Sequence, residues 1–201
     1  VGLHTGEKVN MTFKPAPENH GVIFQRIDLD GQPLVHADVD LVIDTSRGTT
    51  LSENGAQIHT VEHVMAALAA MELDNVLVEL DGPEPPIMDG SARDFLEALR
   101  KAGRQKQEAE REIFEIQDAV NYREADRSVE LAVLPDSAYS LSVYIDYNSD
   151  VMAPQQVALD NFADFAGEFA DARTFCFLHE LDEMKQQDLI KGGSLDAAVV
   201  W

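Results

Sequence analysis

The chain has 201 residues, of which 45% are hydrophobic, and its formal net charge at pH 7 is −22. This apolar content is enough for a packed core, and the length allows one large domain or two small ones. The strong acidity argues against a nucleic-acid partner, because nucleic acids are bound by surfaces rich in lysine and arginine.

Targeting and redox features are sparse. The longest apolar runs, at residues 76–80 and 197–201, are too short to cross a membrane, and no signal peptide precedes the first motif. The single cysteine, Cys176, has no partner for an internal disulfide, so we expect a cytoplasmic protein. Because the chain starts without Met and stops inside an apolar, strand-like run, we expect a fragment of a longer protein.

The first half of the chain contains several strand-like segments. We expect strands over residues 8–13, 21–26, 49–52, 56–59 and 75–80. Asn54-Gly55 separates two of these strands and predicts a tight hairpin, because this dipeptide accepts the positive φ angles of the turn.

Two amphipathic helices accompany these strands. The first is expected to start at Thr60 as N-cap, and it places Val61, Val64, Met65 and Leu68 on one apolar stripe. The second is expected to begin at Ser91, with Asp94 as its capping partner, and to end at a C-terminal cap on Gly103.

The second half repeats the order of strands followed by helix. The charged stretch 104–111 is the expected linker, followed by strands near residues 113–116, 128–134 and 139–147. A helix carrying Phe162, Phe165 and Phe169 comes next. This alternation predicts an α+β fold with two similar halves.

The most informative stretch is His59-Thr60-Val61-Glu62-His63. In a helix that starts at Thr60, Glu62 and His63 project away from the apolar stripe. They could be half of a metal site, with His63 as ligand and Glu62 as base for a water, or simply surface residues of a first helical turn. A third interpretation is the His-x-x-Glu-His pattern of zinc metalloproteases, which needs His59 and His63 on one continuous helix.

Six motifs occur in order along the whole chain. They are Val1-Gly2-Leu3-His4-Thr5-Gly6, Lys14-Pro15-Ala16-Pro17, Thr60-Val61-Glu62-His63, Pro86-Ile87-Met88-Asp89-Gly90-Ser91, Arg173-Thr174-Phe175 and Gly192-Gly193-Ser194-Leu195-Asp196. In this series the chain resembles the zinc-dependent UDP-3-O-acyl-N-acetylglucosamine deacetylases of lipid A biosynthesis.

The resemblance implies a domain organisation. The family has two α/β sandwich domains of two layers and similar topology, each with a small insert, and its active site lies between them. We therefore expect a first domain over residues 1–103, a linker over 104–111, and an incomplete second domain over 112–201. The insert of the second domain is expected around residues 175–201.

The resemblance also implies an activity, the hydrolysis of the N-acetyl group of UDP-3-O-(3-hydroxyacyl)-N-acetylglucosamine, the committed step of lipid A biosynthesis. Glu62 matches the family's general base, His63 a ligand of Zn²⁺, and Thr174 the hydroxyl that binds the tetrahedral intermediate. His4 and Asp89 match residues near the active site. Residues matching the passage for the acyl chain are Phe175, Phe177, Leu178, Gly193, Ser194 and Val200.

The chain departs from the family pattern in two places. His59 stands where the family usually has a small polar residue. The family's other two zinc ligands come from a His-Lys-x-x-x-Asp segment, which these 201 residues do not contain, so we expect this chain alone to be inactive. Some members carry a hydroxyacyl-carrier-protein dehydratase domain downstream, which is a further expectation for the full-length protein.

Overall fold

The computed structural model describes all residues from Val1 to Trp201. Its largest sheet has the strand order β1–β7–β2–β3. These strands are β1 (Met11–Pro15), β2 (Val22–Arg26), β3 (Leu34–His36) and β7 (Val76–Leu80). The central pair β2 and β7 is parallel, whereas β1 pairs with β7 and β3 with β2 in antiparallel register. The strands expected over residues 21–26 and 75–80 are confirmed.

A smaller antiparallel sheet contains β4 (Val42–Asp44), β5 (Thr50–Glu53) and β6 (Ala56–Ile58), and a 3-10 turn (Val39–Leu41) precedes it. The predicted hairpin joins β5 to β6. Asn54 and Gly55 have φ angles of 52° and 77°, as a tight turn of this kind requires.

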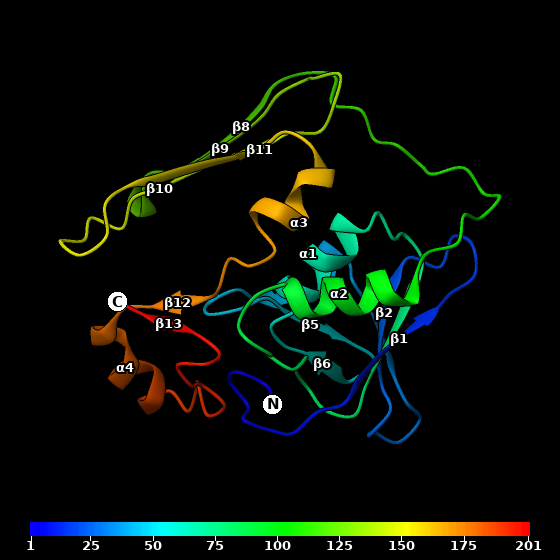
Figure 1. The fold of residues 1–201 in the computed structure, drawn as a ribbon, viewed down its shortest axis with the longest axis horizontal. Coiled ribbons are helices and arrows are strands. Elements are labelled where there is room, and N and C mark those ends of the chain that lie inside the picture. Colours follow the sequence, from blue (N-terminus) through cyan, green and yellow to red (C-terminus); the bar gives the residue numbers. More distant parts are fainter.

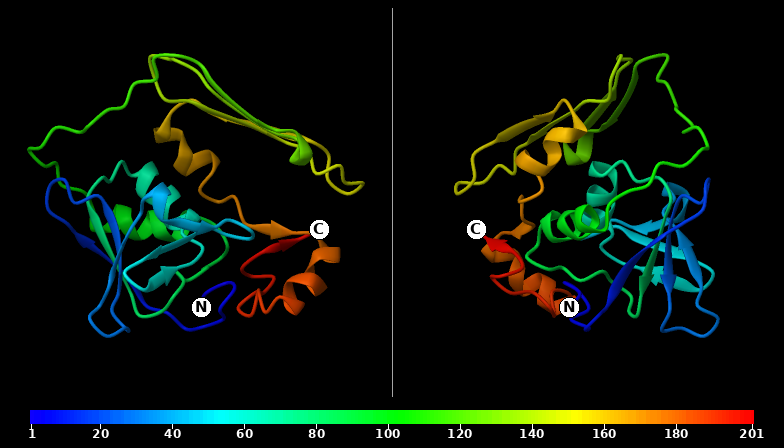
Figure 2. Two further views of the ribbon diagram at one scale, coloured as in Figure 1. Left: turned by 180° about the vertical axis from the view of Figure 1, so that it is seen from behind. Right: turned by 45° about the vertical axis from the view of Figure 1, so that its right-hand side comes forward.

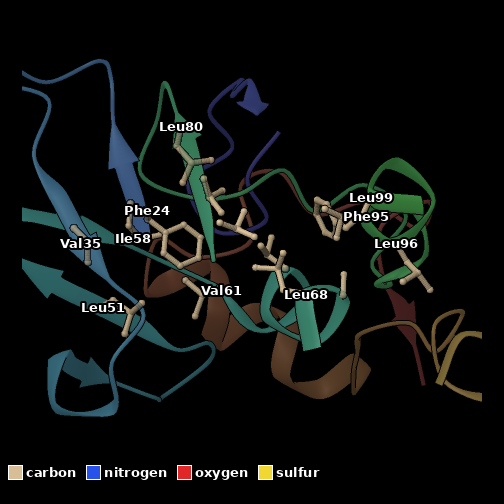
Figure 3. Close-up of a cluster of buried hydrophobic side chains, with 14 of the residues drawn as sticks. Phe24, Val35, Leu51, Ile58, Val61, Leu68, Leu80, Phe95, Leu96 and Leu99 are labelled. Carbon is tan, nitrogen blue, oxygen red and sulfur yellow. The ribbon is translucent and has the colours of Figure 1, made fainter. Parts of the chain in front are cut away.

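Helices α1 (Glu62–Ala70) and α2 (Arg93–Ala102) pack together against these sheets (Figure 1). The predicted C-terminal cap of α2 is confirmed, since Gly103 has a φ of 80°. Both sheets and both helices contribute to one core (Figure 3), whose members are Phe24, Val35, Leu51, Ala56, Ile58, Val61, Val64, Ala67, Leu68, Val76, Val78, Leu80, Phe95, Leu96, Leu99 and Ala170.

Residues 104–119 form no helix and pair with no strand until β8 begins. The strand expected at residues 113–116 is therefore wrong, and Ile113 and Phe114 are 77% and 89% exposed. The preceding charged stretch is held to the first half of the chain by ion pairs from Arg104 to Glu72 and from Arg111 to Asp74.

Two hairpins follow, and they run alongside each other away from the first sheets (Figure 2). They consist of β8 (Val120–Glu124) with β9 (Val129–Val133) and β10 (Leu141–Ile145) with β11 (Gln155–Leu159). A 3-10 turn (Ala125–Arg127) joins β8 to β9. These strands agree with those expected near residues 128–134 and 139–147.

The last part of the chain returns toward α1 and the N-terminus (Figure 1). It contains a 3-10 turn (Phe162–Asp164), α3 (Phe165–Glu168), β12 (Phe175–Cys176), a second 3-10 turn (Leu178–Glu180), α4 (Leu181–Gln186) and β13 (Val199–Val200). Strands β12 and β13 are parallel. The α+β class is confirmed, and the division into two domains of similar topology stays a prediction. None of the helices has the length and apolar character needed to cross a bilayer.

Candidate active site

The first turn of α1 presents Glu62 and His63 beside the core without burying them in it. Val61, Val64 and Leu68 are buried, so the predicted apolar stripe is confirmed. Glu62 is exposed, and its carboxylate accepts a hydrogen bond from the backbone N–H of Thr49. The two candidate residues are thus carried by a helix that the core holds in place.

The predicted N-cap of this helix is wrong. Thr60 lies two residues before α1 and has a left-handed φ of 54°, which is unfavourable for a β-branched residue. Its hydroxyl donates to Glu84 Oε1 at 2.9 Å instead of capping an α1 amide. A carboxylate 24 residues away thus binds the chain at the point where it enters the helix.

His63 is partly buried, and its surroundings suit a metal ligand. Burial lowers the pKa of the His63 imidazole, while the negative charges of Glu62 and Asp89 oppose this shift. A lowered pKa keeps the ring neutral near pH 7, and a neutral imidazole is the form that binds metals. Asp89 therefore contributes to the electrostatic surroundings of His63.

His59 belongs to different surroundings. It follows β6, its Nδ1 lies 3.0 Å from Thr50 Oγ1, and its backbone N–H donates to Pro83 O. Burial lowers the pKa of His59 as well. The metalloprotease pattern requires His59 and His63 on one continuous helix. His59 lies outside that helix, because left-handed Thr60 separates it from α1.

Asp89 organises the turn before α2. Its carboxylate accepts hydrogen bonds from Ser91 N and Ser91 Oγ and pairs with the Arg93 guanidinium. Partial burial alone would raise the pKa of Asp89, but the Ser91 hydrogen bonds and the charges of Arg93 and Arg173 outweigh it and hold the pKa below its ordinary value. The predicted start of this helix at Ser91 is wrong, because α2 begins at Arg93 with Ala92 as its N-cap. The predicted capping partner Asp94 is wrong as well, since the backbone N–H of Ser91 donates to Asp89.

Thr174 lies against the same turn, although 84 residues separate Arg173 from Asp89 in sequence. Thr174 N donates to Gly90 O at 2.7 Å, and Arg173 Nε donates to Asp89 O at 2.6 Å. Arg173 also donates to Leu195 O at 2.9 Å. Gly90 has a φ of 86° and no space for a Cβ, because Ala197 O occupies that position. The structure therefore brings Thr174 to the loop that also carries Asp89.

The predicted acyl-passage residues have several environments. Phe175 lines a cavity of about 360 Å³, together with Ile145, Tyr147, Met152, Gln155, Asp171, Arg173, Val199 and Trp201. Phe177 is buried behind it in edge-to-face contact with Phe175, whereas Leu178 is 67% exposed.

The other three predicted residues lie outside the cavity lining. Gly193 and Ser194 belong to the turn that leads toward β13, where Ser194 O accepts from the backbone N–H of Ala197 and Ala198. Val200 lies on β13, but its neighbour Val199 contributes to the cavity. Sequence reasoning missed Tyr147 and Met152, because their apolar character alone does not distinguish a cavity wall from a core.

His4 belongs to the N-terminal loop. Its Nε2 lies 3.1 Å from Arg47 O, its backbone N–H points at the Glu84 carboxylate, and its Nδ1 is buried without a hydrogen-bond partner. Of the predicted site residues, Glu62 and His63 share the first turn of α1, and Thr174 is hydrogen-bonded to the turn that carries Asp89. The structure holds no group of three His, Cys, Asp or Glu side chains arranged to bind a metal.

Comparison with known proteins gives the same family along the entire chain. The family described as LpxC, UDP-3-O-acyl N-acetylglycosamine deacetylase, matches residues 1–201. The chain is 45% identical over 201 residues to the UDP-3-O-acyl-N-acetylglucosamine deacetylase of Myxococcus xanthus and 41% identical over 203 residues to that of Xanthomonas oryzae pv. oryzae. These alignments cover 100% of the chain and 63% and 66% of the two relatives.

The chain is also similar to proteins that are named bifunctional. It is 43% identical over 199 residues to the bifunctional enzyme LpxC/FabZ of Bacteroides thetaiotaomicron, an alignment that covers 99% of the chain and 43% of that relative. The chain thus spans less than half of the bifunctional relative and just under two thirds of the deacetylases. The family matches all residues of the chain, and the chain is 45% identical to the Myxococcus deacetylase. The chain therefore belongs to the LpxC family of UDP-3-O-acyl N-acetylglycosamine deacetylases.

Proposed function

We propose that the full-length protein is a zinc-dependent amide hydrolase that removes the N-acetyl group of UDP-3-O-(3-hydroxyacyl)-N-acetylglucosamine. The observation that carries this proposal is the match of the LpxC family to all residues of the chain, with exposed Glu62 and partly buried His63 at the start of a well-anchored helix. The names of the Myxococcus and Xanthomonas relatives support the same substrate.

The donor chemistry of this chain fits part of a zinc site. His63 offers a neutral imidazole, and three protein ligands with one open position are usual for catalytic zinc. Within these residues His63 is the ligand that the family pattern uses, and we assign the other ligands to the family's His-Lys-x-x-x-Asp segment. When bound, zinc supplies the Lewis acidity that activates water and polarises the amide carbonyl.

The residues of this chain have distinct roles in the reaction. Glu62 takes a proton from a water molecule while the water oxygen bonds to the carbonyl carbon of the acetyl group. Thr174 donates a hydrogen bond to the carbonyl oxygen, which becomes negatively charged. The carbon–nitrogen bond then breaks, the nitrogen gains a proton, and acetate and the free amine are released. The resemblance assigns that last proton to a histidine outside these residues.

The test is release of acetate from substrate labelled in the acetyl group, measured with the full-length protein. A zinc chelator should abolish release, and added zinc should restore it, because the metal supplies both activation steps. Release that survives complete removal of metal would exclude the zinc mechanism. Absence of release with zinc restored would exclude the activity itself.

A rival proposal, a metalloprotease site built on His59 and His63, has less support because His59 is outside α1. If it were correct, His59→Ala would abolish tight zinc binding, whereas the deacetylase proposal expects zinc binding to persist.

The context of the enzyme is also part of the proposal. We propose a cytoplasmic protein, on the basis of the unpaired Cys176. A fused dehydratase domain, expected from the resemblance, is consistent with the relatives named LpxC/FabZ. Reading the coding sequence beyond Trp201 tests for both the domain and the His-Lys-x-x-x-Asp segment.

A further inference from the structure

Glu84 is a buried carboxylate outside the site described above. It belongs to the turn after β7 and is 1% exposed, yet it forms no ion pair with a lysine or arginine. Neutral donors surround it instead. Oε1 accepts from His4 N and Thr60 Oγ1, and Oε2 accepts from His4 N, Thr5 N and Thr5 Oγ1, at 2.9–3.1 Å.

These hydrogen bonds explain why a charged group is tolerated there. Burial is the largest influence on the pKa of Glu84 and would raise it, but the donors of Thr5, His4 and Thr60 outweigh burial and lower the pKa. The group therefore stays ionised near neutral pH. Only a carboxylate offers two acceptor oxygens with no donor, which is what this set of donors requires.

The bonds of Glu84 join segments that are far apart in the chain. The loop from Gly2 to Gly6 is fastened to the turn after β7, and Gly2 has no space for a Cβ, which would collide with Glu84 and Thr5. The same loop accepts hydrogen bonds from Gly192 N to Leu3 O and from Lys191 N to His4 O. Glu84 thus holds the N-terminal loop, which in turn contacts the C-terminal segment at Lys191 and Gly192. Figure 1 shows the N-terminal loop beside that segment.

The hydrogen bond from Thr60 to Glu84 connects these segments to α1, the helix that carries Glu62 and His63. Thr60 holds a left-handed conformation that costs free energy for a β-branched residue, and it is two residues from Glu62. Backbone support comes from the same turn, since His59 N donates to Pro83 O at 2.8 Å. The direction in which the chain enters α1 therefore depends on the Pro83–Glu84 turn.

We propose that Glu84 is a positioning residue for deacetylation: through Thr60 it fixes the entry to α1 and so the orientation of Glu62 and His63. This inference rests on the proposed function. The proposed base and the zinc ligand lie in the first turn after Thr60, so a shift of that turn moves both together. A displacement of about 1 Å at a reacting group can lower the rate by about 100-fold.

Three variants of the full-length protein test the proposal. Glu84→Gln keeps the size of the side chain but replaces one acceptor oxygen by an amide NH2 group, a donor that faces other donors. Thr60→Val replaces the hydroxyl by a methyl group, whereas Thr60→Ser keeps the hydroxyl and removes the methyl group. The matched control is Glu79→Gln, the same change at a carboxylate on β7 that pairs with Lys14.

We expect Glu84→Gln and Thr60→Val each to lower kcat by about 10- to 100-fold. KM should stay within about threefold of that of the unmodified protein, because substrate binding is not the interaction removed. Thr60→Ser should recover most of the lost kcat, and Glu79→Gln should not change it. The double variant Glu84→Gln/Thr60→Val should be no slower than the slower single variant, because the two residues act as a unit.

Each result decides the matter. A folded Glu84→Gln with normal kcat and only a lower Tm would show that Glu84 is structural, and the proposal would be wrong. If Glu84→Gln does not fold, Thr60→Val decides instead, since it removes a single hydrogen bond at the edge of the cluster. If the unmodified protein releases no acetate, the proposed function fails, which is a different outcome from equal release by the unmodified protein and Glu84→Gln.

Discussion

The first 103 residues and the remainder of the chain differ sharply in how they bury apolar side chains. Almost all of the main core belongs to the first region, in which two sheets close on α1 and α2. After residue 103 the buried side chains are Met152, Leu159, Ala170, Phe177, Met184 and Ala197. The hairpins instead expose large apolar residues such as Tyr122, Leu131 and Tyr144.

This contrast separates two tasks. The first region holds Glu62 and His63 on a helix whose inner face is fully packed, which suits groups that must keep a fixed geometry. The second region reaches the site through a few hydrogen bonds from Arg173 and Thr174 to the turn at Asp89 and Gly90. We infer that the first region fixes the geometry of the proposed base and zinc ligand, and that the second region adds Thr174 and the residues of the cavity.

The largest expected effect concerns the proposed base. In the full-length protein, Glu62→Gln should lower kcat by about 10²–10⁴, because the amide cannot accept the proton of water. Zinc content, measured by elemental analysis, should not change. Near-normal turnover would remove Glu62 as the base, and loss of zinc would mean that it supports the metal instead.

Stability provides a direct comparison of the two regions. Phe24→Ala in the core should lower the free energy of unfolding by about 3–5 kcal/mol, because it leaves a cavity. Tyr144→Ala on the exposed hairpin should change it by less than about 0.5 kcal/mol. Urea unfolding of the 201-residue chain measures both, and equal losses would contradict the contrast drawn above.

The contribution of the second region to chemistry can be tested at Thr174. Thr174→Val removes the hydroxyl and keeps the shape, so kcat should fall by about 10²–10³ if the hydroxyl stabilises the oxyanion. Thr174→Ser is the control that retains the donor. A Val variant with unchanged kcat would limit Thr174 to its backbone hydrogen bond with Gly90.

A smaller effect is expected for the acyl chain. Each buried methylene contributes about 0.8 kcal/mol, so kcat/KM should fall about fourfold for each methylene removed from the substrate. Phe175→Ala should flatten this dependence because Phe175 lines the cavity, whereas Leu178→Ala should not, because Leu178 is exposed. If Leu178→Ala flattens the dependence and Phe175→Ala does not, the acyl chain does not bind in this cavity.

The smallest effect concerns pH. Burial lowers the pKa of His59 below its ordinary value of 6.5, so the unfolded chain binds a proton that the folded chain resists. Stability should therefore decrease as the pH falls below about 6.5, until the pH reaches the lowered pKa of the folded state. His59→Asn should remove part of this slope in urea titrations at several pH values. An unchanged slope would show that His59 does not contribute to it.

Local patterns in the sequence were sufficient for much of the first region. The hairpin at Asn54-Gly55, the apolar stripe of α1 and the cap at Gly103 all follow from turn chemistry or helical periodicity, which act over a few residues. The pairing of Glu62 with His63 could likewise be predicted, because adjacent residues on one helical turn need no distant partner.

Tertiary structure alone decided how the site is assembled. The left-handed Thr60, the buried Glu84 and the contacts of Arg173 with the Asp89 turn depend on hydrogen bonds between residues 24 to 84 positions apart, and no local pattern encodes such bonds. Packing of the distant segments likewise decides that Phe175 but not Leu178 lines the cavity. Residue types and spacing predict which groups are candidates for the chemistry, whereas long-range hydrogen bonds decide which segments carrying them meet.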